Sequence, residues 1–146
     1  MSLFFDDLAV GTRFESGTTT LDAAAIREFA AQYDPQPFHL DDAAARTTLF
    51  GGLAASGWHT AAVTMRLLVE SVPIAGGLIG AGNDISWPRP TRPDDVLRVV
   101  TDVVEMTPSA SRPDRGRVVM RSETLNQNGE VVQILLARLV VPRRTP

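Results

Sequence analysis

The sequence Tyr33-Asp-Pro-Gln-Pro-Phe-His-Leu-Asp41 places an acidic side chain and an imidazole on one stiff piece of chain. Asp34 and His39 are separated by four residues, two of which are prolines. Proline fixes its own φ and restricts the residue before it, so this linker has few conformations and holds the two side chains at a nearly constant offset. Such a rigid pairing of a carboxylate with an imidazole is typical of an acid/base site.

The residues before this stretch predict a helix over residues 23–33. Asp22 is a suitable N-cap, and Leu21 and Ile26 have the spacing of a hydrophobic staple. Pro35 disfavours helical geometry at Asp34, so the helix should end there and place the Asp34 carboxylate at its C-terminal end. Apolar side chains recur on one face of this helix, at Ile26, Phe29, Ala30 and Tyr33.

Two more helices are predicted after His39. A short helix should begin at Asp41 or Asp42 and end at Gly51-Gly52, where a left-handed cap is permitted. A longer helix should run from Ser56 to about Val72, and Pro73 should stop it. Its apolar residues spread over most of its circumference, which predicts a helix buried nearly all round. Arg66 and Glu70 should pair along its one solvent-exposed edge.

The rest of the chain predicts strands. One is expected near Thr12–Thr19, and Asn128-Gly129 should turn between the last two strands. The others are rich in β-branched residues and fall at residues 78–79, 85–87, 96–104, 117–125 and 131–141. The expected fold class is α+β, with an antiparallel sheet curled around one long central helix.

Composition limits the possible partners. A chain of 146 residues with 44% hydrophobic content predicts a single domain over residues 1–146. A net charge of -3 with scattered arginines argues against a nucleic-acid partner. No apolar run reaches the roughly 20 residues needed to cross a bilayer, so we expect no membrane partner. The N-terminus has no basic signal-peptide region, and a cytoplasmic location is expected.

Missing residue types narrow the chemistry. The chain has no cysteine and no lysine, which excludes thiol nucleophiles and lysine-bound pyridoxal within it. It has two histidines, so it cannot form a three-histidine zinc site by itself. A site of two histidines and one carboxylate is formally possible, but the sequence has no recognisable ligand spacing for it. We therefore expect no metal and no cofactor.

The chain resembles the MaoC-like dehydratase family, which includes (R)-specific enoyl-CoA hydratases. The most specific match is the 33–41 stretch, which is similar to the hydratase signature of Asp, four residues and His. Ala54-Ala-Ser-Gly57 is similar to the segment that opens the family's central helix, and Trp87-Pro-Arg-Pro-Thr-Arg-Pro-Asp-Asp-Val-Leu97 to its strand corner. Ser56 differs from the His of many relatives, and Asp94-Asp95 stands where the corner usually has Gly-Asp.

The resemblance implies the hot-dog fold and an acid/base role for Asp34 and His39. Gly57 is the expected backbone donor to the thioester oxygen, since the first turn of a helix has unpaired N–H groups. Ser56 should cap the helix or touch the substrate. Pro37 and Phe38 are also predicted to bind substrate.

Ordinary structural roles are expected for other residues that could bear chemistry. His59 is expected to pack or cap, and Trp58 and Trp87 to lie in the core or an interface. Loop geometry explains Asn83 and Asp84 as well as a pocket does. Arg89 and Arg92 could meet carrier phosphates, although solvated corner charges are the more usual outcome.

The predicted function is reversible hydration of enoyl-CoA or enoyl-acyl-carrier-protein thioesters in fatty acid metabolism. Two alternatives stay open: an acyl-CoA thioesterase on the same fold, and a non-catalytic acyl-binding subunit of a heteromeric dehydratase. Because the sheet leaves a free edge, a homodimer or higher homo-oligomer is expected, paired edge strand to edge strand, with the pocket at the subunit boundary.

Overall fold

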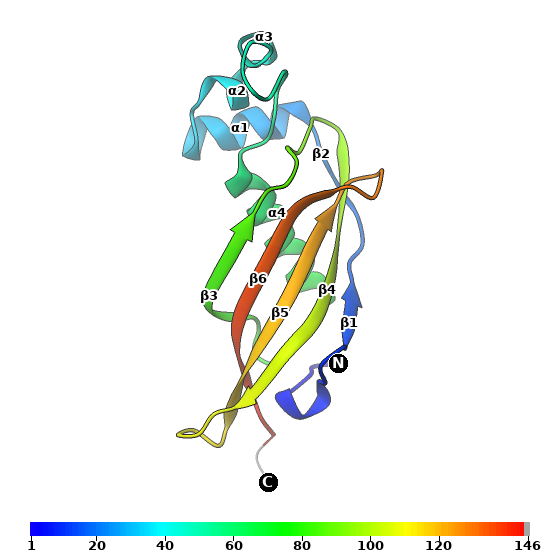
Figure 1. The fold of residues 1–146 in the computed structure, drawn as a ribbon, viewed down its shortest axis with the longest axis vertical. Helices are drawn as coiled ribbons and strands as arrows, with labels where there is room; N and C mark the ends of the chain where they lie inside the picture. The colour runs from blue at the N-terminus through cyan, green and yellow to red at the C-terminus, as the bar shows by residue number, and fades with distance from the viewer. Residues whose placement is uncertain (145–146) are drawn as a thin grey trace.

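The computed structural model describes residues 1–144, which form one antiparallel sheet and one long helix with smaller helices around them (Figure 1). The helical elements are η1 (Phe5–Asp7), α1 (Ala23–Tyr33), α2 (Pro37–Leu40), α3 (Asp42–Ala45) and α4 (Gly57–Ser71). The strands are β1 (Arg13–Glu15), β2 (Thr19–Leu21), β3 (Ile79–Ser86), β4 (Asp95–Pro108), β5 (Arg115–Leu125) and β6 (Val131–Pro142).

The sheet has the strand order β1-β4-β5-β6-β3, and β2 also pairs with β4. Side chains of β4 alternate between buried and partly exposed, as expected for a strand with one face on the core. The pieces predicted at residues 78–79 and 85–87 are a single strand, β3, whose pairing with β6 shifts between Gly80 and Gly82. The strand predicted near residues 12–19 is divided into β1 and β2.

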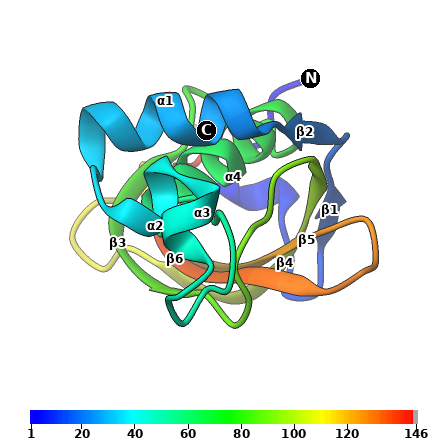
Figure 2. The same ribbon diagram turned by 90° about the horizontal axis from the view of Figure 1, so that it is seen from above.

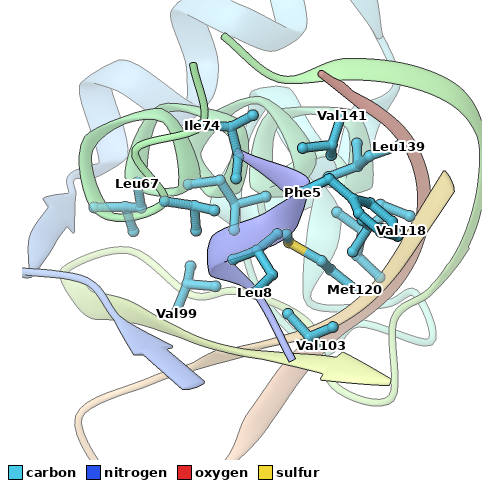
Figure 3. Packing of buried hydrophobic residues seen from close by; sticks show 14 residues of the cluster. Phe5, Leu8, Leu67, Ile74, Val99, Val103, Val118, Met120, Leu139 and Val141 are labelled. Atoms are coloured by element: carbon cyan, nitrogen blue, oxygen red, sulfur yellow. The ribbon is translucent and has the colours of Figure 1, made fainter. Parts of the chain in front are cut away.

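The sheet curves around α4, as Figure 2 shows from above. Leu67 and Leu68 of α4 join side chains from all the long strands in the main core. Phe5 and Leu8, at and just after η1, close this core (Figure 3). The predicted sheet curled around a central helix is therefore confirmed.

The prediction that α4 is buried nearly all round is wrong. Trp58, Met65 and Val69 are exposed, and so is Ala62 between them. These four residues have helical spacing and form one exposed apolar stripe along α4. The predicted Arg66–Glu70 pair is present, with 3.1 Å between Nε and Oε1.

The predicted helix over residues 23–33 is confirmed as α1. Asp22 caps it by accepting a hydrogen bond from the Ala25 N–H at 2.8 Å, and Asp34 is its C-cap. The helix expected to reach Gly51-Gly52 is shorter than predicted: α3 ends at Ala45, and His39 itself lies in the preceding α2. The residues after Ala45 form turns and bends instead, and among them Phe50 contacts His39.

The β5–β6 turn departs in detail from a two-residue hairpin. Only Gly129 has a positive φ, of 73°, while the Asn128 N–H bonds to the Asn126 side chain. None of the helices within residues 1–144 has both the length and the apolar character needed to cross a membrane.

Candidate active site

The residues predicted to carry chemistry meet at the end of the molecule opposite the termini, where α1, α2 and the start of α4 gather (Figure 1). Asp34 ends α1, His39 lies in α2, and Ser56 caps α4. Pro37 occupies the first position of α2, where a missing N–H costs nothing. The stiff linker between Asp34 and His39 thus runs from the C-terminal end of α1 into the start of α2.

Asp34 and His39 face each other, with 3.3 Å between Asp34 Oδ2 and His39 Nε2. The imidazole is buried, at 4% exposure, and the carboxylate is mostly covered. Both side chains line the same pocket. One small molecule such as water could therefore contact the two groups at once.

Asp34 is held as an anion by its neighbours. Ser56 Oγ donates a hydrogen bond to Oδ2 at 2.7 Å, and Gln36 Nε2 donates to Oδ1. Burial raises the pKa of Asp34, but the hydrogen bonds from Ser56 and Gln36 and the charge of a protonated His39 outweigh it, so the pKa lies below its ordinary value of 3.8. Asp34 is consequently ionised at neutral pH.

The protonation of His39 is constrained from its other side. Nδ1 lies 2.7 Å from the carbonyl oxygen of Ala54. A carbonyl can only accept, so Nδ1 carries a proton. The exchangeable proton position of His39 is therefore Nε2, the atom that faces Asp34 and the pocket.

Gly57 is the first residue of α4, and its N–H has no hydrogen-bond partner among residues 1–144. The structure also gives a packing reason for glycine here. A Cβ at this position would lie 2.7 Å from Cε2 of Trp87, so the indole occupies the space that a side chain would need. Trp87 is in turn fixed by a hydrogen bond of 2.9 Å from Nε1 to Gln133 Oε1.

The pocket has a volume of about 400 Å³. Phe50, Trp58 and Trp87 give it aromatic walls, and Thr60 and Thr91 give it hydroxyl groups. The two threonine hydroxyls are buried and bonded to each other at 2.9 Å. A partly apolar cleft with a few convergent polar groups is the usual form of a small-molecule site.

Three residues predicted to contact substrate lie outside the pocket lining. Ser56 is fully buried beneath Asp34, Pro37 is exposed at the start of α2, and Phe38 packs its ring edge-on against His39. Ser56 caps α4 by accepting from the Trp58 N–H at 3.3 Å, as predicted. A direct contact of these three with substrate stays a prediction.

The predicted packing role of His59 is confirmed. Its ring is buried and stacks on Phe29 at 4.4 Å, joining α4 to α1, and burial lowers its pKa. Of the two roles predicted for Trp58 and Trp87, the core is wrong, because their exposures are 61% and 40% and they meet edge to face at the pocket; the interface stays a prediction.

The corner arginines have different environments. Arg89 pairs with Glu130 at 3.0 Å and lines the pocket. Arg92 instead directs its guanidinium at backbone carbonyls of residues 50–53. Asn83 lines a separate apolar cavity of about 220 Å³, and Asp84 pairs with Arg138.

Sequence reasoning missed Phe50, whose ring centroid lies 5.7 Å from that of His39. It lies in the segment predicted as helical. Its only local signal is its aromatic character just before Gly51-Gly52.

Comparison with known proteins shows to which family the chain belongs. The model of the family described as MaoC like domain matches residues 7–124. The chain belongs to the MaoC-like family. Its antiparallel sheet around a helix is the hot-dog fold of MaoC dehydratases.

Several relatives of this MaoC-like protein are known. A MaoC-like dehydratase from Rhodospirillum rubrum is 62% identical, with a TM-score of 0.97, covering 99% of this chain and 100% of the other. The R-hydratase PhaJ1 from Pseudomonas aeruginosa is 29% identical, with a TM-score of 0.77, covering 98% of this chain and 88% of the other. A 3-hydroxybutyryl-CoA dehydratase from Methylorubrum extorquens is 28% identical over 112 residues, which is 75% of this chain and 69% of the relative.

Proposed function

We propose that this MaoC-like protein is a hydro-lyase that reversibly adds water to α,β-unsaturated acyl thioesters of CoA or acyl carrier protein. The observation that carries the proposal is the Asp34–His39 pair, 3.3 Å apart in one pocket. The names of the hydratase and dehydratase relatives support the same reaction class.

In the hydration direction, a water molecule in the pocket would contact both the Asp34 carboxylate and His39 Nε2. Its oxygen bonds to Cβ of the substrate, Nε2 takes one of its protons, and that proton is then delivered to Cα. The C=C double bond becomes a single bond, and the addition needs no oxidant or reductant. Asp34 orients the water and stabilises the imidazolium that forms. General acid–base catalysis of this kind contributes about 10²–10⁴-fold to a rate.

Negative charge that develops on the thioester oxygen requires a donor. The free N–H of Gly57 lies at the N-terminus of α4, where the helix dipole also favours negative charge. A single donor of this type is worth about 10²–10³ in rate.

We also propose that the protein works as a homodimer. Strand β3 is a free edge of the sheet, and most of its side chains are exposed. Met65 of the α4 stripe and Gly80 of β3 line the same apolar cavity, so the stripe and the edge form one continuous surface. A second copy paired along β3 would cover both, and would border the pocket near Trp58.

The test is hydration of crotonyl-CoA by wild type, Asp34→Asn and His39→Ala. Both variants should lose at least about 10²-fold in kcat/KM, since each removes one proton-handling group. The loss of enoyl absorbance is measured together with free thiol. His59→Phe, which keeps the stacking on Phe29, is the matched histidine control and should stay active.

Near-normal turnover by either variant would refute the acid/base assignment. Release of free thiol by the wild type would instead support the thioesterase alternative. Thioester binding without turnover at any chain length would support a non-catalytic acyl-binding subunit.

A further inference from the structure

The segment of residues 50–55 holds His39 in place, but it has no regular secondary structure of its own. It places the Ala54 carbonyl at Nδ1 and the Phe50 ring beside the imidazole. An irregular segment keeps a fixed shape only if other groups satisfy its backbone. The groups that do so determine how precisely His39 is held.

Arg92 supplies most of the donors to this segment. Its Nη1 donates to the carbonyls of Gly52 at 3.0 Å and Leu53 at 3.3 Å, and its Nη2 donates to the carbonyl of Phe50. Within residues 1–144 the guanidinium forms no ion pair with a carboxylate. A guanidinium has five donors in a rigid plane, which allows one side chain to hold three carbonyls at once.

Arg92 is itself firmly placed. Its backbone N–H donates to Oδ2 of Asp95 at 2.8 Å, and this carboxylate is buried at 5% exposure. Next to it, the Thr91 carbonyl accepts from the Ala55 N–H at 2.9 Å. The corner that begins β4 therefore provides a rigid base for the guanidinium.

A second clamp holds the same segment from α3. Asp42 Oδ1 accepts from the Leu53 N–H at 2.9 Å. Gly52 passes close to both clamps, since a Cβ there would lie 3.4 Å from Asp42 Oδ1 and 3.7 Å from Arg92 Nη1. The backbone just before Ala54 is thus hydrogen-bonded through its carbonyls to Arg92 and through the Leu53 N–H to Asp42.

We propose that Arg92 is a positioning residue for His39, acting through the 50–55 segment to keep the proton on Nδ1 and Nε2 toward Asp34. Without the guanidinium, three carbonyls lose their donor and the segment relaxes. The Ala54 carbonyl then no longer fixes the tautomer of His39. The kinetic consequence rests on the proposed hydratase function, but the effect on the tautomer does not.

The direct test is the tautomer of His39 in the whole protein, read from the ¹⁵N shifts of its ring. The chain has two histidines, so the spectrum is simple, and His59 serves as an internal reference. The neutral His39 of the wild type should be the Nδ1–H form. In Arg92→Ala it should become a mixture, and added guanidinium ion should restore the wild-type form.

The kinetic test compares crotonyl-CoA hydration by Arg92→Ala, Arg92→Lys and wild type. We expect kcat to fall by about 10- to 100-fold with little change in KM, because a catalytic group is misplaced while the pocket walls remain. Lysine should rescue poorly, since one ammonium cannot span three carbonyls. Arg66→Ala, which removes an exposed arginine of α4, is the control.

The proposal is overturned if Arg92→Ala folds and its neutral His39 remains in the Nδ1–H form. If Arg92→Ala does not fold, Arg92→Lys must show the tautomer mixture, and an unchanged His39 there overturns the proposal equally. A shifted tautomer in a protein that hydrates no enoyl thioester would support the role of Arg92 and refute the proposed function.

Discussion

Ser56 shows how one hydroxyl contributes to the ionisation of the carboxylate in the candidate site. It is fully buried, caps α4, and donates to Asp34 Oδ2. Burial alone would raise the pKa of Asp34, so the lowered value depends on this donor and on Gln36. The same hydroxyl thus links the start of the central helix to the ionisation of the site.

Replacement of Ser56 by alanine should raise the pKa of Asp34. The acid limb of kcat/KM should move to higher pH, and the ¹³C titration of the Asp34 carboxyl should move with it. The loss of the helix cap should also cost about 1 kcal/mol of stability. Ser71→Ala, at the other end of α4, is the control, and an unmoved Asp34 titration would contradict the prediction.

The same shift has a consequence for stability. Because the folded pKa of Asp34 lies below 3.8, the ionised carboxylate stabilises the fold above that pH. This contribution is lost as the pH falls through the lowered folded pKa. In Ser56→Ala the folded pKa moves back toward the unfolded one, so this contribution should be smaller.

Asp94 is a strained residue at the β3–β4 corner. It has a φ of 69°, and it is the one non-glycine residue with positive φ among residues 1–144. Glycine adopts such a positive φ without the Cβ clash that an L residue has there. Asp94→Gly should therefore raise the free energy of unfolding by about 0.5–1 kcal/mol.

Urea unfolding measures this effect. Asp94→Ala is the informative control because it removes the charge but keeps a Cβ at positive φ, and it should give no comparable gain. Equal stabilisation by both substitutions would attribute the effect to charge instead of backbone strain.

At the level of elements, the junction of α4 with the corner after β3 depends on Gly57. A methyl group there would displace the Trp87 ring and break its bond to Gln133, whose side chain is fully buried. Gly57→Ala should cost about 1–3 kcal/mol and change the near-ultraviolet circular dichroism.

Gly17→Ala is the matched control, since a Cβ at Gly17 would meet no atom within 4 Å. Gly57→Ala should also lower the proposed hydratase activity, because the pocket wall moves. A variant with unchanged stability and an unchanged aromatic spectrum would show that Trp87 is not fixed as described.

The elements that the sequence predicted well have local signals. Helix α1 follows from Asp22, the apolar spacing and Pro35, all within a few residues. The sequence did not predict elements whose structure depends on contacts with residues far away in the chain. The two glycines in β3 interrupt its pattern, yet pairing with β6 keeps it one strand. The 50–55 segment is held by Arg92, some 40 residues away, and no local pattern reports such a contact.

In the candidate site, too, the residues with local sequence signals were predicted and those placed by distant contacts were not. Asp34 and His39 could be predicted because the proline linker fixes them in sequence. Phe50 and the bond between Ser56 and Asp34 could not, because they arise only when α2, α4 and the irregular segment meet.

For the whole molecule, the exposed stripe of α4 beside the β3 edge is the basis for the dimer prediction. Wild type should sediment as a dimer at micromolar concentration. Val69→Arg should weaken the dimer, because a charge on a buried apolar face is costly. Val104→Arg, on an exposed position of β4, should leave it intact. A monomeric wild type would refute the dimer and the placement of the pocket at its boundary.

The chain has two tryptophans, and both line the pocket. Both fluorescent indoles therefore lie where a ligand would enter. Trp58 is exposed to solvent, and the Trp87 ring packs against Gly57 at the start of α4. Intrinsic fluorescence should accordingly report occupancy directly, through a spectral shift or quenching, without a dye or a coupled assay. Candidate acyl thioesters could be ranked by titration even when they are not turned over.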